Sequence, residues 1–405
     1  MSDPVSVVID GFAHGGDGVG RLDGKAVFVP GALPGETVTV TLTENRDRYA
    51  RGTLVDVLVP AENRAAPPCP YVPRCGGCDL QHLNADGHAQ IKRRVVTEQL
   101  ERIGKIAAPN VTDTRIPTGL TGYRSQIRLH ATKNGILGFY AHHSHTVVPI
   151  THCLIANPGV KRALDVIGTA PGAKDVTIRS FDGVSAVVTL TPSHDNRDAY
   201  AKTVARLRDK NLPWLTVNDP KQQMTVTVGP HTFHAPPDAF FQSSVAAATV
   251  ITDEVLHAAG ALAGTHVADL YAGVGLFSVP LAHAQATVTA VEANRAATKA
   301  AATNVSGLDV TVVTDTVENF LHTNNTRFDV VVLDPPRNGA GTPVIEQIVP
   351  RKPERIVYVA CDPAAFARDA RALTTHGYQL QRAVPIDAFP MTHHVEVVAT
   401  FIPNR

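Results

Sequence analysis

A glycine-rich turn between an apolar strand and a helix is the feature that most limits how this chain can fold. Residues 267–282 read VADLYAGVGLFSVPLA, with Gly273 and Gly275 in the turn, and a second apolar strand at 286–291 is closed by Glu292. Such glycines let a ligand approach the backbone, and the amino end of the following helix favours a carboxylate. An acid about twenty positions beyond the glycines is placed to bind ribose hydroxyls. This order of elements predicts a doubly wound, nucleotide-binding α/β sheet.

Two further apolar runs stop at polar residues. Residues 328–337 read FDVVVLDPPR, and residues 357–363 read VYVACDP. Pro363 cannot donate to a strand ladder and favours an extended Asp362, so Cys361 is expected on the first residue outside the sheet. A lone cysteine at a strand end is more often an inert buried thiol, so the role of Cys361 has to be inferred from the motifs elsewhere in the chain.

Size and composition narrow the class of protein. A chain of 405 residues predicts two or three domains, and 44% hydrophobic with 18% charged residues fits a soluble globular protein. No long apolar run or signal-like start is present in the sequence, so we expect a cytoplasmic protein without a membrane partner, and a monomer. A net charge of zero argues against a broadly basic nucleic-acid coat, so any RNA contact must use local patches.

The first sixty residues alternate short β-rich runs with glycine turns, which predicts a five-stranded barrel of the OB kind. They hold five Lys or Arg against eight Asp or Glu. One loop combines basic side chains with an aromatic residue, as phosphate contacts often do: Arg46, Arg48, Tyr49 and Arg51. A packing or protein-contact role for the barrel is the alternative.

Four of the five cysteines form a candidate ligand set. Cys69, Cys75 and Cys78 lie within ten residues, and Cys153 is the only other cysteine besides Cys361. In a cytosolic chain this grouping indicates metal or cluster binding rather than disulfides. Zinc and an iron–sulfur cluster are both compatible with four thiolates.

Other basic segments carry weaker signals. A helical pattern at 88–100 contains Lys92, Arg93 and Arg94, for which a solvated helix face is expected and a phosphate contact is the alternative. Residues 121–148 predict antiparallel strands around an Asn-Gly turn. Three histidines there, expected on the surface rather than at a metal, are His142, His143 and His145.

In order along the chain, DLYAGVGLFSVPLA, VEAN, DPPR, YVACDP and FPMTHHVE resemble the RNA uracil-5-methyltransferases, which use S-adenosylmethionine on tRNA or 23S rRNA. The barrel resembles the TRAM module of some members, so the resemblance covers nearly the whole chain. It implies a TRAM-like OB barrel at 1–62, an α+β central RNA-binding domain with the cluster segment at 63–235, and a Rossmann-like class I methyltransferase domain at 236–405.

The resemblance also implies two cofactors. The family's CxxxxxCGGC segment with a later cysteine holds a 4Fe–4S cluster of structural role, which assigns Cys69, Cys75, Cys78 and Cys153 as its ligands, with zinc or no metal as alternatives. Residues carried over as S-adenosylmethionine contacts are Gln242, Tyr271, Gly273, Gly275, Glu292, Asp315 and Asp334. Gln242 belongs to an FFQ motif at 240–242, in which Phe240 would stack on a base. For Phe241, a position in the hydrophobic core is the alternative.

Uracil itself dictates the expected chemistry. Its carbon 5 is too weak a nucleophile to take a methyl group until a thiolate adds at carbon 6, and Cys361 is the cysteine outside the ligand set. A base must later remove the carbon 5 proton, and Glu396 matches the family's base. The family commonly shows Ser-Cys-Asn-Pro where this chain has ACDP; we expect Asp362 to point away from the thiol and cap the next helix.

The target uridine must leave its stack or lie in a loop. A barrel together with a cluster resembles the 23S rRNA enzymes, so 23S rRNA is the expected substrate and the tRNA T loop the alternative. A 5-methylcytosine enzyme would need a second catalytic cysteine where DPPR has Pro336. A non-catalytic RNA-binding ribosome-assembly protein is the remaining alternative.

Overall fold

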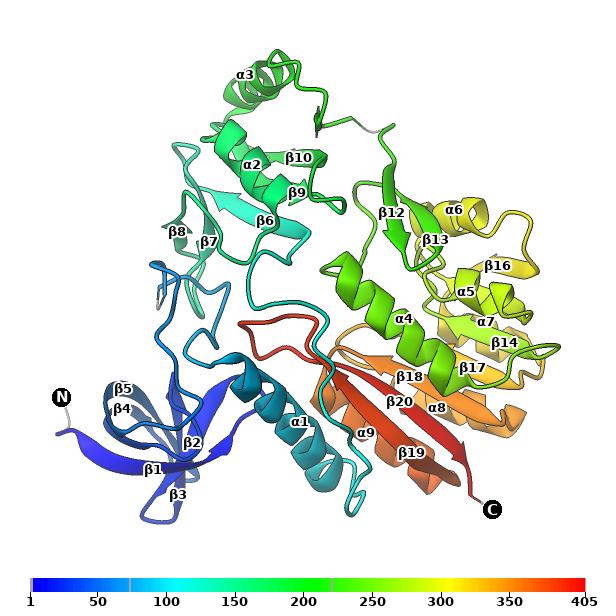
Figure 1. The fold of residues 1–405 in the computed structure, drawn as a ribbon, viewed down its shortest axis with the longest axis horizontal. Helices are drawn as coiled ribbons and strands as arrows, with labels where there is room; N and C mark the ends of the chain where they lie inside the picture. The colour runs from blue at the N-terminus through cyan, green and yellow to red at the C-terminus, as the bar shows by residue number, and fades with distance from the viewer. Residues whose placement is uncertain (1–2, 73, 220, 405) are drawn as a thin grey trace.

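The computed structural model describes residues 3–72, 74–219 and 221–404, so the ends of the two outer expected domains, residues 1–2 and 405, lie outside it. A closed barrel, a six-stranded sheet, a short hairpin and a seven-stranded sheet follow one another along the chain. Figure 1 shows the blue barrel beside the central sheet, with the seven-stranded sheet on the other side of the molecule. Within the described ranges, no helix has the length and apolar character needed to cross a membrane.

The amino-terminal barrel closes in the order β1-β2-β3-β5-β4. Strands β3 and β5 pair in parallel and all other neighbours pair antiparallel. Alternate side chains such as Val27 and Val29 point into the barrel core, as the β-rich pattern predicted. The strands are β1 (Val5–Phe12), β2 (Asp17–Leu22), β3 (Lys25–Pro30), β4 (Thr37–Asn45) and β5 (Tyr49–Val59).

Helix α1 (Ala85–Arg102) lies between the barrel and the carboxy-terminal sheet. Ile91 and Val95 pack in one cluster with residues of the barrel, whereas Val96 and Leu100 pack in the core of that sheet. The helix therefore has two apolar stripes, each with an i, i+4 spacing, and both stripes are buried.

Lys92 was expected on a solvated face of this helix. That prediction is wrong, because both faces of the helix are buried. The Lys92 side chain is 1% exposed and pairs with Asp387, while Arg93 remains exposed as expected. The sequence predicts a single exposed surface for Lys92, Arg93 and Arg94 because it does not reveal that α1 is covered on two sides.

The central six-stranded sheet has the order β11-β10-β9-β6-β7-β8, and the predicted Asn134-Gly135 turn joins β6 to β7. Helices α2 and α3 pack against it. Its strands are β6 (Gln126–Ala131), β7 (Leu137–Tyr140), β8 (Val147–Pro149), β9 (Ala173–Arg179), β10 (Ala186–Pro192) and β11 (Leu215–Val217); its helices are α2 (Pro158–Ile167) and α3 (Arg197–Arg208). The hairpin of β12 (Met224–Val228) and β13 (His231–Ala235) follows.

The seven-stranded sheet has the order β16-β15-β14-β17-β18-β20-β19, in which β20 runs antiparallel between β18 and β19. The first five strands in this order are parallel, which is the predicted Rossmann-like arrangement. The strands are β14 (His266–Leu270), β15 (Thr287–Glu292), β16 (Val310–Thr314), β17 (Val330–Leu333), β18 (Arg355–Ala360), β19 (Tyr378–Ile386) and β20 (Glu396–Pro403). The helices are α4 (Val245–Ala259), α5 (Ser278–His283), α6 (Arg295–Asn304), α7 (Val317–Thr323), α8 (Thr342–Ile348), η1 (Val349–Arg351) and α9 (Pro363–Thr375).

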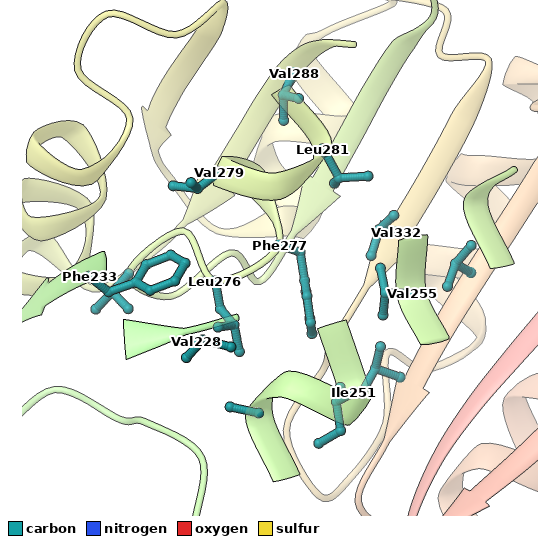
Figure 2. Packing of buried hydrophobic residues seen from close by; sticks show 14 of the residues in the cluster. Val228, Phe233, Ile251, Val255, Leu276, Phe277, Val279, Leu281, Val288 and Val332 are labelled. Atoms are coloured by element: carbon teal, nitrogen blue, oxygen red, sulfur yellow. The ribbon is translucent and has the colours of Figure 1, made fainter. Parts of the chain in front are cut away.

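Both faces of this sheet are buried, which explains why its strands read as continuous apolar runs. Val330 and Val332 of β17 face one core with α4, whereas Val331 and Leu333 face the other core with α8 and α9. Figure 2 shows Phe277, just after the glycine turn, between β17 and α4. The turn is thus anchored in the core on the side of the sheet that α4 covers.

Candidate active site

Five predicted site residues meet along one edge of the seven-stranded sheet. Parallel strands end at the same edge, and strand order reverses between β14 and β17, where doubly wound sheets bind ligands. Each residue either closes its strand or follows it directly: Tyr271 after β14, Glu292 at the end of β15, Asp315 after β16, Asp334 after β17 and Cys361 after β18.

The glycine turn has the backbone that its sequence predicts. Gly273 and Gly275 have φ angles of 58° and 87°, and Tyr271 beside them has φ 65°, a strained value for an aromatic residue. A methyl group added at Gly273 would meet no heavy atom within 4 Å, so the turn borders open space. Oε2 of Glu292 accepts a 3.0 Å hydrogen bond from the Gly273 amide and has lone pairs left for a ligand.

Along the chain, the FFQ motif at 240–242 precedes the glycine turn and Asp315 follows it. Asp315 Oδ2 accepts a 2.6 Å hydrogen bond from Asn319, which fixes its carboxylate. Gln242 is buried and Phe240 is 76% exposed. Phe241 packs in the hydrophobic core, so the core alternative for this phenylalanine is correct.

Cys361 and Glu396 are neighbours across two paired strands. The antiparallel register pairs Ala360 of β18 with Val397 of β20, so Cys361, the residue after Ala360, lies opposite Glu396, the residue before Val397. Burial raises the pKa of the Cys361 thiol to about 12, and the nearby carboxylates of Glu396 and Asp334 add to this shift. Burial likewise raises the pKa of Glu396 to about 7.

Arg337, the last residue of DPPR, is the cation of the site. Its charge lowers the pKa of both Cys361 and Glu396, against the larger effect of burial. Burial raises the pKa of Asp334, and the nearby carboxylate of Glu396 raises it further. No role was predicted for Arg337 from the sequence, although an arginine directly after a strand-end acid and two prolines is a signal.

Asp362 caps the helix that follows Cys361, as predicted. Its Oδ1 accepts a 2.7 Å hydrogen bond from the Ala365 amide at the start of α9. The other oxygen, Oδ2, lies 2.9 Å from Nε2 of His14 in the barrel. No feature of the sequence indicated this second partner.

The loop at 387–395, which leads to Glu396, is held by residues from distant parts of the chain. Tyr123 donates to the Pro390 carbonyl (2.9 Å) and Ser243 to the Ala388 carbonyl (2.8 Å). The Asp79 carboxylate accepts from the His393 amide at 2.8 Å. Tyr123 is 6% exposed, so it tethers this loop rather than offering a surface to RNA.

The four cysteines of the predicted ligand set line one cavity of about 330 Å³, together with Arg124. All four are free thiols. Burial raises the pKa of Cys78 to about 12, and the nearby Cys153 and Cys75 add to this shift. Within the described ranges, no three His, Cys, Asp or Glu side chains are arranged to hold a metal ion, and His142, His143 and His145 are exposed.

Two family models match the chain. The TRAM domain model matches residues 5–55, and the model described as tRNA (uracil-5-)-methyltransferase matches residues 189–402. An uncharacterized RNA methyltransferase of Caldanaerobacter subterraneus subsp. tengcongensis is 31% identical over 447 residues, covering 98% of both chains. One from Streptomyces avermitilis is 32% identical over 429 residues, covering 100% of this chain and 99% of the relative.

A solved structure shares the fold along nearly the whole chain. Pyrococcus abyssi tRNA (uracil-54, C5)-methyltransferase in complex with S-adenosyl-L-homocysteine superposes with a TM-score of 0.74. The match covers 98% of this chain and 100% of that one, at 22% identity. The shared architecture therefore includes the barrel and both sheets.

Proposed function

Because the chain belongs to the tRNA (uracil-5-)-methyltransferase family and carries a TRAM domain, we propose that it methylates carbon 5 of a uridine in RNA through a covalent adduct with Cys361. The observation that carries this proposal is the placement of Cys361 beside Glu396 at the carboxyl edge of the sheet. A thiol for carbon 6 and a base for the carbon 5 proton are the two groups that the reaction requires.

In the first step the Cys361 sulfur, as thiolate, bonds to carbon 6 and pushes the electron pair of the 5,6 double bond onto carbon 5 and the carbonyl oxygen. Arg337 favours the thiolate, because its charge opposes the rise in the pKa of Cys361. S-adenosylmethionine would supply the methyl group as a sulfonium: carbon 5 takes the methyl, and the electron pair of the S–CH3 bond stays on the sulfur of the departing S-adenosyl-L-homocysteine. Glu396 then removes the carbon 5 proton, the double bond reforms, and the sulfur leaves with its electron pair.

We propose that the glycine turn and the acids around it bind S-adenosylmethionine. Gly273 borders open space with an unobstructed backbone, which suits the methionine part of the cofactor. Glu292 would receive the ribose, and Asp315 would lie by the adenine. Tyr271, Gly275, Gln242 and Asp334 complete the proposed contacts.

We further propose that Cys69, Cys75, Cys78 and Cys153 hold a 4Fe–4S cluster. The four thiols line one cavity, and the resemblance to the family assigns these four cysteines to a cluster in which each binds a different iron. Zinc or no metal are the alternatives. The cluster would pin the 69–80 segment to the central sheet.

The proposed substrate is 23S rRNA, because a barrel combined with a four-cysteine segment resembles the 23S rRNA enzymes. A T-loop uridine of tRNA is the second candidate, since the Pyrococcus abyssi tRNA enzyme shares the whole architecture. A non-catalytic assembly role would require that Cys361 be dispensable.

Mass mapping of modified nucleosides tests the proposal. We would compare 23S rRNA and tRNA from cells with the protein, without it, and with the Cys361→Ala variant. Loss of 5-methyluridine in 23S rRNA, not restored by the variant, is expected. Loss in the tRNA T loop would move the reaction to the second substrate, and unchanged 5-methyluridine in every RNA would refute the proposed activity.

A further inference from the structure

The turn between β1 and β2 reaches from the barrel to the proposed nucleophile. Nε2 of His14 lies 2.9 Å from Oδ2 of Asp362, the residue after Cys361. The side chains of His14 and Asp362 are each 29% exposed, so solvent only partly screens this contact. The barrel therefore meets the reaction centre directly, besides any contact that it makes with RNA.

The rest of the turn fits closely against the loop that leads to the proposed base. The His14 ring lies edge-on to the His393 ring, with 6.3 Å between centroids. A side chain on Gly16, which has φ 95°, would approach Cβ of His393 to 3.3 Å and the Asp79 carboxylate to 3.5 Å. A Cβ at Gly16 would be in tight contact with His393, and the φ of 95° is unfavourable for any residue with a side chain, so glycine suits the close approach of this turn.

The partner of His14 is also one of the two residues, with Ala360, at which ACDP differs from the family's Ser-Cys-Asn-Pro. A carboxylate at 362, in place of the usual amide, adds to the rise in the pKa of the adjacent Cys361 thiol. Burial raises the pKa of Asp362, but the hydrogen bonds from His14 and from the amide of Ala365 outweigh it and leave that pKa below its ordinary value. Asp362 is thus ionised, and His14 is the side chain that faces its charge.

We propose that His14 is a positioning residue for methyl transfer, which holds the Asp362 carboxylate and thereby orients the start of α9 and the Cys361 thiol. This inference rests on the proposed function of Cys361 as nucleophile. The carboxylate of Asp362 opposes formation of the thiolate at Cys361 unless a hydrogen-bond donor balances its charge. Because His14 is that donor, the thiol becomes reactive only when the barrel is docked.

The test measures alkylation of Cys361 by iodoacetamide in the full chain without RNA, from pH 7 to 9.5, with the peptide containing Cys361 quantified by mass spectrometry. His14→Ala is expected to slow alkylation about tenfold, the effect of about one pKa unit. Asp362→Asn, which removes the charge, should react at least as fast as the unmodified protein. The double variant should behave like Asp362→Asn.

Two outcomes would overturn the proposal. Unchanged alkylation in His14→Ala would show that His14 does not act on the thiol. An equal loss from His14→Ala in the Asp362→Asn background would show that His14 serves barrel docking alone. Arg21→Ala, an exposed barrel residue that donates only within the described barrel, to the Gly24 carbonyl, is the matched control and should react normally.

Methylation kinetics supply a second readout. His14→Ala should lower kcat about tenfold with little change in KM for RNA, because it acts on the thiol rather than on RNA binding. A rise in KM alone would contradict the positioning role. Because alkylation needs no RNA, it remains informative even if the protein proves not to methylate uridine.

Discussion

At the scale of single residues, burial raises the pKa of the proposed nucleophile and of the proposed base above their ordinary values. Burial, with smaller contributions from neighbouring carboxylates, raises the pKa of Cys361 to about 12. Burial raises the pKa of Glu396 to about 7, close to the pH at which a general base is most effective. The thiol is therefore protonated at neutral pH, and the charge of Arg337 favours its thiolate.

Replacing Glu396 by Gln is expected to trap the reaction after methyl transfer. Without the base, the carbon 5 proton stays in place and Cys361 cannot leave, so turnover should fall at least about 100-fold. A covalent protein–RNA adduct should accumulate, visible as a shifted band on a denaturing gel. The double variant with Cys361→Ala provides the control, in which no adduct should form.

In the unmodified enzyme, release of the adduct should depend on the charge of Glu396. As the proposed base, Glu396 would work only when deprotonated, so the release rate should fall about tenfold per pH unit well below pH 7 and level off above it. A release rate that is constant between pH 5.5 and 8, measured by chasing preformed adduct, would assign the proton to another group.

At the scale of elements, the loop at 387–395 depends on α1. Lys92 pairs with Asp387 and also donates to the Phe389 carbonyl at 3.0 Å. Burial lowers the pKa of Lys92 and raises that of Asp387, and each partner opposes the shift in the other. In Figure 1 the red loop extends from the sheet toward the segment around α1. The pair therefore joins the position of the proposed base to that of a helix almost 300 residues away in the sequence.

Lys92→Met should destabilise the protein by about 3–5 kcal/mol, because it leaves Asp387 buried without its partner. Urea unfolding followed by circular dichroism measures this loss. Adding Asp387→Asn should recover part of it. Arg93→Met, one position along and exposed, is the control; an equally small loss in both single variants would show that the buried pair contributes little.

The sequence predicted the elements that carry chemistry but not the contacts between them. The strand ends at Asp334 and Cys361 and the turn at Gly273 could be located because local residues determine where a strand stops and where a turn needs glycine. The pairs of His14 with Asp362 and of Lys92 with Asp387 are 348 and 295 residues apart, and no local pattern marks either partner. Because no local pattern marks its partner, the sequence predicts a solvated position for Lys92.

At the scale of the whole molecule, the net charge is zero, so binding of a polyanion must depend on where cations are left unpaired. The basic loop of the barrel shows this. Arg46 is paired with Glu44 at 2.7 Å, and Arg51 with Asp17 at 3.2 Å. Arg48 is exposed and has no ion pair within the described ranges. It is the residue of that loop best placed to meet a phosphate.

Arg48→Ala should weaken RNA binding to a similar degree for 23S rRNA fragments and for tRNA, because a phosphate contact carries no sequence information. Loss of one such contact should also reduce the slope of log Kd against log salt by about 0.7–0.9. Fluorescence anisotropy at several KCl concentrations measures both effects. Arg46→Ala, whose guanidinium is already engaged by Glu44, should change the slope less. If Arg48→Ala left the slope unchanged, the barrel would contribute to catalysis through its docking on Asp362 and not through phosphate binding by this loop.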